Sequence, residues 1–198
     1  MTIGDRYEFR AFTRHLGRVE DRLRDAGTLK DIRESREIYI VSAANDDINV
    51  KLRAGLLDIK SRIGVQAGLE QWAPILKLEL PLAASTLREQ VLDRLGATAL
   101  TLDRDHYGLD DLVEQVARPS PVLVPAQVHK CRWQFTLGDC MAEFAEVSIN
   151  GAWMVTACVE SVDPEAVSRA VSTLGLDAYD NESYLAAIKR VVGLIPLP

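Results

Sequence analysis

Cations spaced two residues apart recur through the chain, and this spacing could create an anion-binding surface. Three such pairs lie in strand-like segments: Lys51 with Arg53, Lys60 with Arg62, and Lys130 with Arg132. Residues two apart in a β-strand point to the same face of a sheet. Because Arg and Lys grip phosphate oxygens through charge-assisted hydrogen bonds, these faces could hold a chain of phosphates.

Carboxylates accompany the cations and could supply ligands for a metal ion. The stretch RYEFR alternates Arg6, Glu8 and Arg10, and further candidates on strand-like segments are Lys77 with Glu79, Glu143, Glu146 and Glu160. Carboxylates hold Mg²⁺ or Mn²⁺, and such ions bridge phosphate oxygens. Since Glu143 and Glu146 lie three residues apart, only one of them can share the face of a strand with the cations.

Two interpretations of these charged faces stay open. In the first, they are the water-exposed side of a half-buried antiparallel sheet. In the second, they line the interior of a closed barrel, where each unpaired charge would cost several kcal/mol. The second therefore requires carboxylate partners, water and a polyanionic ligand, and it predicts that the paired cations share one interior.

The elements that must position these residues are eight predicted strands. They occupy 5–12, 37–43, 47–53, 56–63, 74–82, 126–137, 140–150 and 153–162, which alternate or carry β-branched and aromatic residues. Turns at Ala54-Gly55 and Asn150-Gly151 predict two tight hairpins, and short hairpins join antiparallel neighbours.

Predicted helices separate groups of strands. They cover 13–27, 85–96 with a Ser85 cap, 109–117, 163–175 with an Asp163 cap and Pro164, and 181–193 with an Asn181 cap. The segment 118–125 is the expected linker between two halves. The pattern is typical of an α+β fold with an antiparallel sheet.

Composition excludes some classes of function. The chain has 198 residues and a net charge of −6, which argues against general nucleic-acid binding while permitting a local cationic pocket. The sequence contains no apolar run near the ~18 residues of a membrane span and no secretory signal. Three cysteines without metal-site spacing favour reduced thiols, so we expect a cytoplasmic protein. The oligomeric state stays open.

The order of elements resembles the CYTH-like superfamily, the triphosphate tunnel metalloenzymes. The resemblance spans nearly the whole chain, in RYEFRAF, NVKLR, DIKSR, LKLEL, VHKCRW, VTACVESVDPEAVSRAVSTLGL and DNESYLAAI. It implies a single domain over 1–198, whose eight-stranded antiparallel closed barrel surrounds a charged tunnel, with helices outside. Members are triphosphatases of inorganic, thiamine or RNA triphosphates, and adenylate cyclases.

The resemblance also implies a set of site residues. Phosphates would be held by Arg10, Lys51, Arg53, Lys60, Arg62, Lys77, Lys130 and Arg132. One Mg²⁺ or Mn²⁺ ion would be held by Glu8, Glu79, Glu146 and Glu160, with Glu8 and Glu160 as the catalytic carboxylates. Two positions depart from the family pattern: Arg6 replaces the first Glu of the opening Glu-x-Glu-x-Lys signature, and Cys158 stands where a partner carboxylate is expected.

Two hypotheses follow for function. The first is hydrolysis of an inorganic or organic triphosphate, with a metal-positioned water attacking the terminal phosphorus. The alternative is a non-catalytic polyphosphate- or nucleotide-binding module of the same fold, favoured by the reversed charge at Arg6. An adenylate cyclase and a structural protein with a polar open sheet are further options, and the second of these predicts no triphosphate binding.

Overall fold

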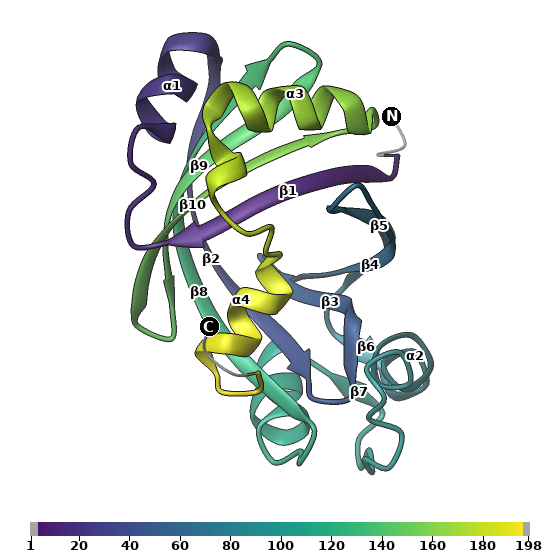
Figure 1. Cartoon of the computed structure of the whole chain (residues 1–198). Helices are drawn as coiled ribbons and strands as arrows, with labels where there is room; N and C mark the ends of the chain where they lie inside the picture. The colour runs from purple at the N-terminus through teal and green to yellow at the C-terminus, as the bar shows by residue number, and fades with distance from the viewer. Residues whose placement is uncertain (1–3, 196–198) are drawn as a thin grey trace.

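A closed barrel of eight antiparallel strands forms the centre of the molecule (Figure 1). The structure is a computed structural model and describes residues 4–195. The strands are β1 (Arg6–Thr13), β2 (Thr28–Ser42), β3 (Asn45–Arg53), β4 (Leu56–Gln66), β5 (Leu69–Glu79), β8 (Leu123–Leu137), β9 (Cys140–Ile149) and β10 (Ala152–Ser161). Their order around the barrel is β1-β10-β9-β8-β2-β3-β4-β5. The predicted eight-stranded antiparallel barrel is therefore confirmed.

Both predicted hairpin turns form. Ala54 and Gly55 have φ of 50° and 77°, and Asn150 and Gly151 have φ of 48° and 89°. Two successive positive φ angles are the geometry of a type I′ turn, whose twist matches that of the flanking strands. These turns fix the register of β3 on β4 and of β9 on β10, and hence which side chains face inward.

The main difference from the prediction lies in β2, which begins at Thr28, whereas the prediction began at residue 37. The added stretch TLKDIRESR is largely polar, so its sequence lacks the alternating apolar residues that indicate a strand. It is held as a strand because β2 pairs with β8 from Thr28↔Thr136 to Ser42↔Leu123. The predicted linker 118–125 is also shortened, because β8 already begins at Leu123. The division into two halves stays a prediction.

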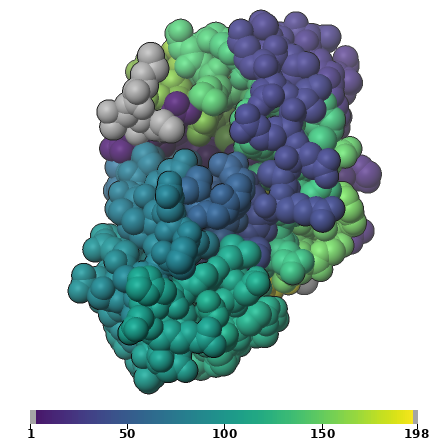
Figure 2. Space-filling view, turned by 180° about the vertical axis from the view of Figure 1, so that it is seen from behind, coloured from purple at the N-terminus to yellow at the C-terminus, as the bar shows by residue number. Residues whose placement is uncertain are grey.

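Helical segments surround the barrel. They are α1 (Val19–Ala26), α2 (Ala84–Leu87), the π-helical η1 (Arg88–Leu92) and η2 (Asp111–Ala117), α3 (Pro164–Leu174), the short η3 (Leu176–Ala178) and α4 (Tyr184–Val191). The strands β6 (Leu82–Ala83) and β7 (His106–Tyr107) form a separate two-stranded sheet. Seen from behind, the segment that contains η2 forms a layer at one end of the molecule (Figure 2).

Helix caps follow the prediction at α3 and differ elsewhere. Asp163 accepts a hydrogen bond from the backbone N–H of Glu165, Pro164 begins α3, and Gly175 ends it in the left-handed conformation. The predicted Ser85 cap is wrong, because the helix starts at Ala84 without a side-chain cap. The predicted Asn181 cap is also wrong: α4 is capped by the Ser183 hydroxyl.

Three apolar clusters hold these layers together. One packs α1 and α3 on the outer face of β1, β8, β9 and β10, and another packs α2, η1 and η2 on the outer face of β3 and β4. The third lies inside the barrel: Tyr184, Leu185 and Ile188 of α4 pack on residues such as Val128 and Val147. Val128 lies two residues before Lys130 on β8, so the two side chains share the inward face. Because α4 packs on Val128, this helix fills one end of the barrel interior. In the described part of the chain, no helix is long and apolar enough to cross a membrane.

Candidate functional site

A cavity of about 640 Å³ occupies the barrel interior, and all eight barrel strands contribute to its wall. Its lining contains eight cations and four carboxylates, and the buried carboxylate of Glu37 pairs with two of these cations, so three positive charges remain in excess in a chain whose net charge is −6. The chain has six lysines, and four of them line this cavity. The cationic side chains are therefore concentrated inside the barrel. The cations are Arg6, Arg10, Lys51, Arg53, Lys60, Lys77, Lys130 and Arg132, and the carboxylates are Glu8, Asp58, Glu143 and Glu160.

Strand register explains why these residues converge. Residues paired across antiparallel strands share a face, and Arg10 pairs with Cys158, which pairs with Glu143. On the opposite wall, Lys51 pairs with Asp58, which pairs with Lys77. Two rows of charged side chains thus face each other across the interior, and the pleat sends the intervening apolar residues outward under the helices.

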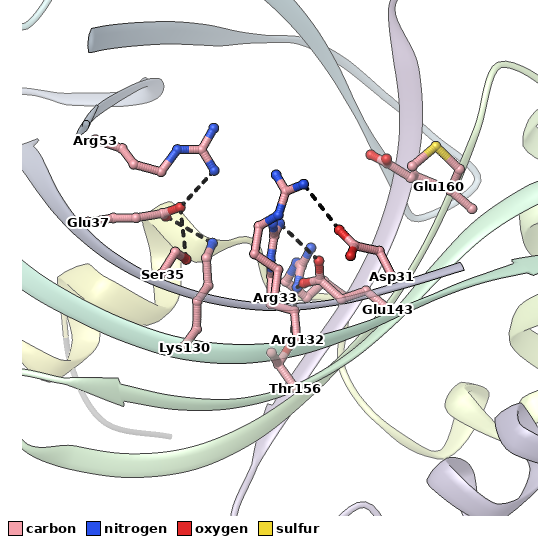
Figure 3. A network of polar contacts seen from close by, with 12 residues as sticks. Asp31, Arg33, Ser35, Glu37, Arg53, Lys130, Arg132, Glu143, Thr156 and Glu160 are labelled. Atoms are coloured by element: carbon pink, nitrogen blue, oxygen red, sulfur yellow. Dashed lines mark hydrogen bonds and ion pairs between the residues drawn. The ribbon is translucent and has the colours of Figure 1, made fainter. Parts of the chain in front are cut away.

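Glu37 of β2 is the centre of a buried charge network (Figure 3). Its side chain is 0% exposed and accepts from Lys130 Nζ at 2.9 Å and from Arg53 Nη1 at 3.3 Å. The Tyr39 hydroxyl donates to Glu37 Oε2, the oxygen that Lys130 also contacts, at 3.0 Å. Burial alone would raise the pKa of Glu37, but Lys130 and Lys51 lower this pKa to about 2. Glu37 is therefore an anion that holds the cations of β3 and β8 in place.

The same network sets the charge state of the lysines. Burial lowers the pKa of Lys51 to about 8, with Lys130 and Arg53 adding to the effect and Glu37 opposing it. Burial also lowers the pKa of Lys130, against the attraction of Glu37 and Glu143. Two lysines held close to other cations with lowered pKa values favour a bound anion, which would stabilise their protonated forms.

Arg10 of β1 organises the opposite wall. Its guanidinium donates to Glu8 Oε1 at 3.0 Å and to Glu143 Oε1 at 3.2 Å, and Arg132 lies 3.5 Å from the second oxygen of Glu143. Burial would raise the pKa of Glu143, but the three cations Arg10, Lys130 and Arg132 lower it. Burial raises the pKa of the Cys158 thiol well above its usual value, so Cys158 adds no charge here.

Arg6 binds the carboxylate on the neighbouring strand. Its Nη1 lies 2.7 Å from Glu160 Oε1 and 2.9 Å from the Met141 sulfur. Glu160 pairs with Glu8 across β1 and β10, so Arg6 shares a face with both carboxylates. Arg6, which departs from the family signature, therefore places a positive charge beside Glu160 and Glu8.

Nine of the twelve site residues predicted from the sequence line the cavity. They are Glu8, Arg10, Lys51, Arg53, Lys60, Lys77, Lys130, Arg132 and Glu160. Two of the three predicted cation pairs, Lys51 with Arg53 and Lys130 with Arg132, therefore line one interior, whereas Lys60 lines it without Arg62. Their roles as ligands stay predictions.

The other three lie elsewhere. Glu146 is exposed and pairs with Cys131 and Val155 on the outer face of β9, so its predicted place in the tunnel is wrong, and Glu143 is the inward carboxylate. Glu79 is exposed at the last position of β5, outside the cavity lining. Arg62 also lies outside the lining and is bound to Asp47 at 2.7 Å and to Glu70 at 2.9 Å.

The predicted metal ligands do not fit a divalent ion. Glu146 and Glu79 lie away from Glu8 and Glu160, and each of the latter two is already bound to a guanidinium. Within residues 4–195, no three His, Cys, Asp or Glu side chains are grouped as a metal site would require. A divalent ion beside Glu8 or Glu160 would also meet the positive charge of Arg6 or Arg10.

Sequence reasoning missed several residues of the cavity. Glu37 and Tyr39 lie in a predicted strand, but Glu37 has no cation two residues away that would mark its face, and its partners come from β3 and β8. Asp58 could have been found, because it alternates with Lys60 and Arg62. Tyr184 comes from α4, and no period in the sequence connects that helix to the barrel interior.

Comparison with known proteins shows the fold. No family model and no curated protein matches the sequence. HpAC1 from Hippeastrum, described as a proposed adenylyl cyclase with a dominant triphosphatase activity, has a TM-score of 0.56 at 15% identity, covering 99% of this chain and 98% of its own. A conserved hypothetical protein from Pyrococcus furiosus has a TM-score of 0.50 at 13% identity, covering 91% of this chain and 98% of its own.

Because these sequence identities are low, the likeness shows the fold alone, and any functional inference must come from the residues of the cavity. In this chain, the strand register builds both the closed antiparallel barrel and its charged interior. The chain shares its fold with these two proteins, and that fold is the eight-stranded closed barrel that the resemblance in its sequence implied.

Proposed function

We propose that the barrel binds a triphosphate or a longer polyphosphate anion without needing a divalent metal. The observation that carries this proposal is the excess of positive charge in the cavity. Lys60 and Lys77 line the cavity, and neither has a carboxylate within 4.0 Å in the described part of the chain. A phosphate chain would supply the missing negative charge along both walls.

In this proposal, no divalent metal is needed to neutralise the carboxylates of the cavity. Arg6 and Arg10 already neutralise Glu160 and Glu8, the carboxylates that would otherwise repel phosphate. The remaining cations of β3, β4, β5 and β8 then face the ligand directly. Arg132 is well placed for this role, since Glu143, its one carboxylate partner within residues 4–195, lies at 3.5 Å and is shared with Arg10.

Hydrolysis of the bound triphosphate is the second candidate function. It is supported by the pairing of Glu8 with Glu160 inside the cavity and by the likeness in fold to HpAC1, which is described as having triphosphatase activity. Phosphate release from tripolyphosphate, with and without Mg²⁺ or Mn²⁺, separates the two candidates. Binding without turnover supports the first, and metal-dependent turnover supports the second.

Calorimetric titration with tripolyphosphate in the presence of EDTA tests the binding proposal. We expect saturable binding that Lys60→Gln and Lys77→Gln each weaken by about three- to tenfold, because each removes one charge-assisted contact. Lys30→Gln is the matched control, since Lys30 is exposed and lies outside the cavity lining. The proposal fails if tripolyphosphate does not bind, or if the Lys30 variant loses as much affinity as the other two.

A further inference from the structure

Tyr184, the first residue of α4, holds its ring close to two cations of the cavity. The ring centroid lies 4.5 Å from the Arg10 guanidinium carbon and 4.5 Å from Lys130 Nζ. The ring also stacks on Tyr39 at 6.0 Å and meets the edge of Phe12 at 4.9 Å. These contacts hold the side chain in one position, with 8% of the residue exposed, on the wall of the cavity.

The hydroxyl of Tyr184 is buried and has no hydrogen-bond partner among the residues that the structure describes. Nε of Arg132, another residue of the cavity lining, is also buried and without a partner within residues 4–195. Burial raises the pKa of Tyr184 well above its usual value, so the hydroxyl keeps its proton and remains a donor. Unpartnered buried polar atoms are rare because they cost stability. Tyr184 and Arg132 both line the cavity, and each carries an unpartnered donor for which a bound anion would supply the acceptor; the unpartnered Oδ1 of Asn49, a third lining residue, is itself an acceptor.

Tyr39 provides an internal comparison. Its ring stacks on Tyr184 and it lines the same cavity, but its hydroxyl donates to Glu37 at 3.0 Å. Of these two neighbouring buried tyrosines, Tyr39 has an acceptor for its hydroxyl among residues 4–195 and Tyr184 has none there.

We propose that the Tyr184 hydroxyl and Nε of Arg132 each donate a hydrogen bond to a phosphate oxygen of the bound anion. The inference rests on the proposed polyphosphate binding and adds a neutral donor from α4 to the cationic walls. Phosphate oxygens accept several hydrogen bonds at once, and a phenol donates one without adding charge. In this arrangement, α4 packs into one end of the barrel and also contributes a donor to the binding site.

Tyr184→Phe tests the proposal because it removes the hydroxyl and keeps the ring that contacts Arg10 and Lys130. The Kd for tripolyphosphate should rise by about tenfold, as expected for the loss of a hydrogen bond to a charged acceptor. The melting temperature of the ligand-free protein should rise by about 2–4 °C, because a buried unpartnered polar group is gone. A residue with a merely structural role would not move affinity and stability in opposite directions.

Two matched variants calibrate these readouts. Tyr39→Phe should lower the melting temperature, because Glu37 loses a donor. Tyr107→Phe is the control for affinity: its hydroxyl accepts from the backbone N–H groups of Asp103 and Arg104, and it lies outside the cavity lining. Tyr107→Phe should therefore lower stability and leave tripolyphosphate affinity unchanged.

Each remaining outcome counts against the proposal in a recognisable way. Wild-type binding with an unchanged Kd for Tyr184→Phe overturns the hydroxyl's role and leaves the proposed function intact. A lower melting temperature for Tyr184→Phe shows that the hydroxyl has an acceptor in the free protein and also overturns it. Absence of tripolyphosphate binding by the wild type overturns the proposed function and this inference together.

Discussion

At the scale of single residues, Glu37 shows how one buried carboxylate fixes several cations. Replacing it with Gln leaves Lys130, which is 4% exposed, without its ionic partner. Removing one member of a buried ion pair costs about 3–5 kcal/mol, so we expect Glu37→Gln to lower the free energy of unfolding by that order. Denaturant unfolding at pH 7 measures the loss. Glu79→Gln, at an exposed position of β5, should change it by less than about 0.5 kcal/mol.

The pH dependence of this effect has a definite sign. The pKa of Glu37 is lowered from 4.5 to about 2 in the folded state, so its contribution is complete above about pH 4.5 and is lost as the pH falls toward 2. The difference between the wild type and Glu37→Gln should shrink over this range. An equal difference at pH 7 and pH 2.5 would contradict the assignment of Glu37 as a buried anion.

Lys51 should make anion binding depend on pH. Its pKa of about 8 means that the free protein loses this positive charge as the pH rises through that value. We therefore expect tripolyphosphate affinity to fall between pH 7 and pH 9.5. Lys51→Arg should flatten the profile, because a guanidinium stays charged over the whole range, while ionisation of the ligand affects both proteins equally. Identical profiles, measured by calorimetry, would remove Lys51 from the binding wall.

At the scale of elements, the seam between β1 and β5 depends on the segment before α4. These two strands pair at three positions only, from Arg6↔Trp72 to Glu8↔Glu70. Beyond them the side chain of Asn181 joins the strands: it accepts from the Arg10 backbone N–H at 2.8 Å and donates to the Gly68 carbonyl at 2.8 Å. The residue predicted as a helix cap therefore closes the barrel.

Asn181→Ala should open this seam locally. The variant loses three side-chain hydrogen bonds, so we expect a loss of about 1–3 kcal/mol of stability and faster hydrogen exchange of the Arg10 amide. Exchange measured residue by residue tests this, with Asp180→Asn, at the exposed neighbouring position, as the control. Unchanged protection of the Arg10 amide would mean that the seam is held by the strands alone.

At the scale of the whole molecule, the balance of charge in the barrel decides whether a metal can take part. Arg6→Glu would free Glu160 and place a second carboxylate beside Glu8 on one face. We expect the variant to need Mg²⁺ or Mn²⁺ for tripolyphosphate binding or turnover, since three carboxylates then converge without Arg6. Arg6→Gln, which removes the cation without adding a carboxylate, separates the two effects.

The measurement is the affinity for tripolyphosphate, and its hydrolysis, against metal concentration for the three proteins. The wild type should bind tripolyphosphate in the presence of EDTA. The bound tripolyphosphate should raise the melting temperature, because it binds the folded state. This stabilisation should shrink as salt rises, but less than it would for an exposed patch. Robust metal-dependent turnover by the wild type that Arg6→Glu abolishes would show that Arg6 serves an active site of a different kind.

The sequence by itself determined the eight barrel strands in outline, the two hairpins and most of the residues that share a strand face, because alternation and turn chemistry are local. It therefore placed Lys51 with Arg53, and Lys130 with Arg132, on common faces. Only the tertiary structure decided that these faces point inward, that Glu143 rather than Glu146 is the inward carboxylate, and that β2 extends to Thr28. Closure of β1 on both β5 and β10 is a long-range pairing, and its register sets the face on which each distant side chain lies. The partners of Glu37, the ion pair of Arg6 with Glu160 and the place of Tyr184 all arise from that closure, since each joins residues that are far apart along the chain.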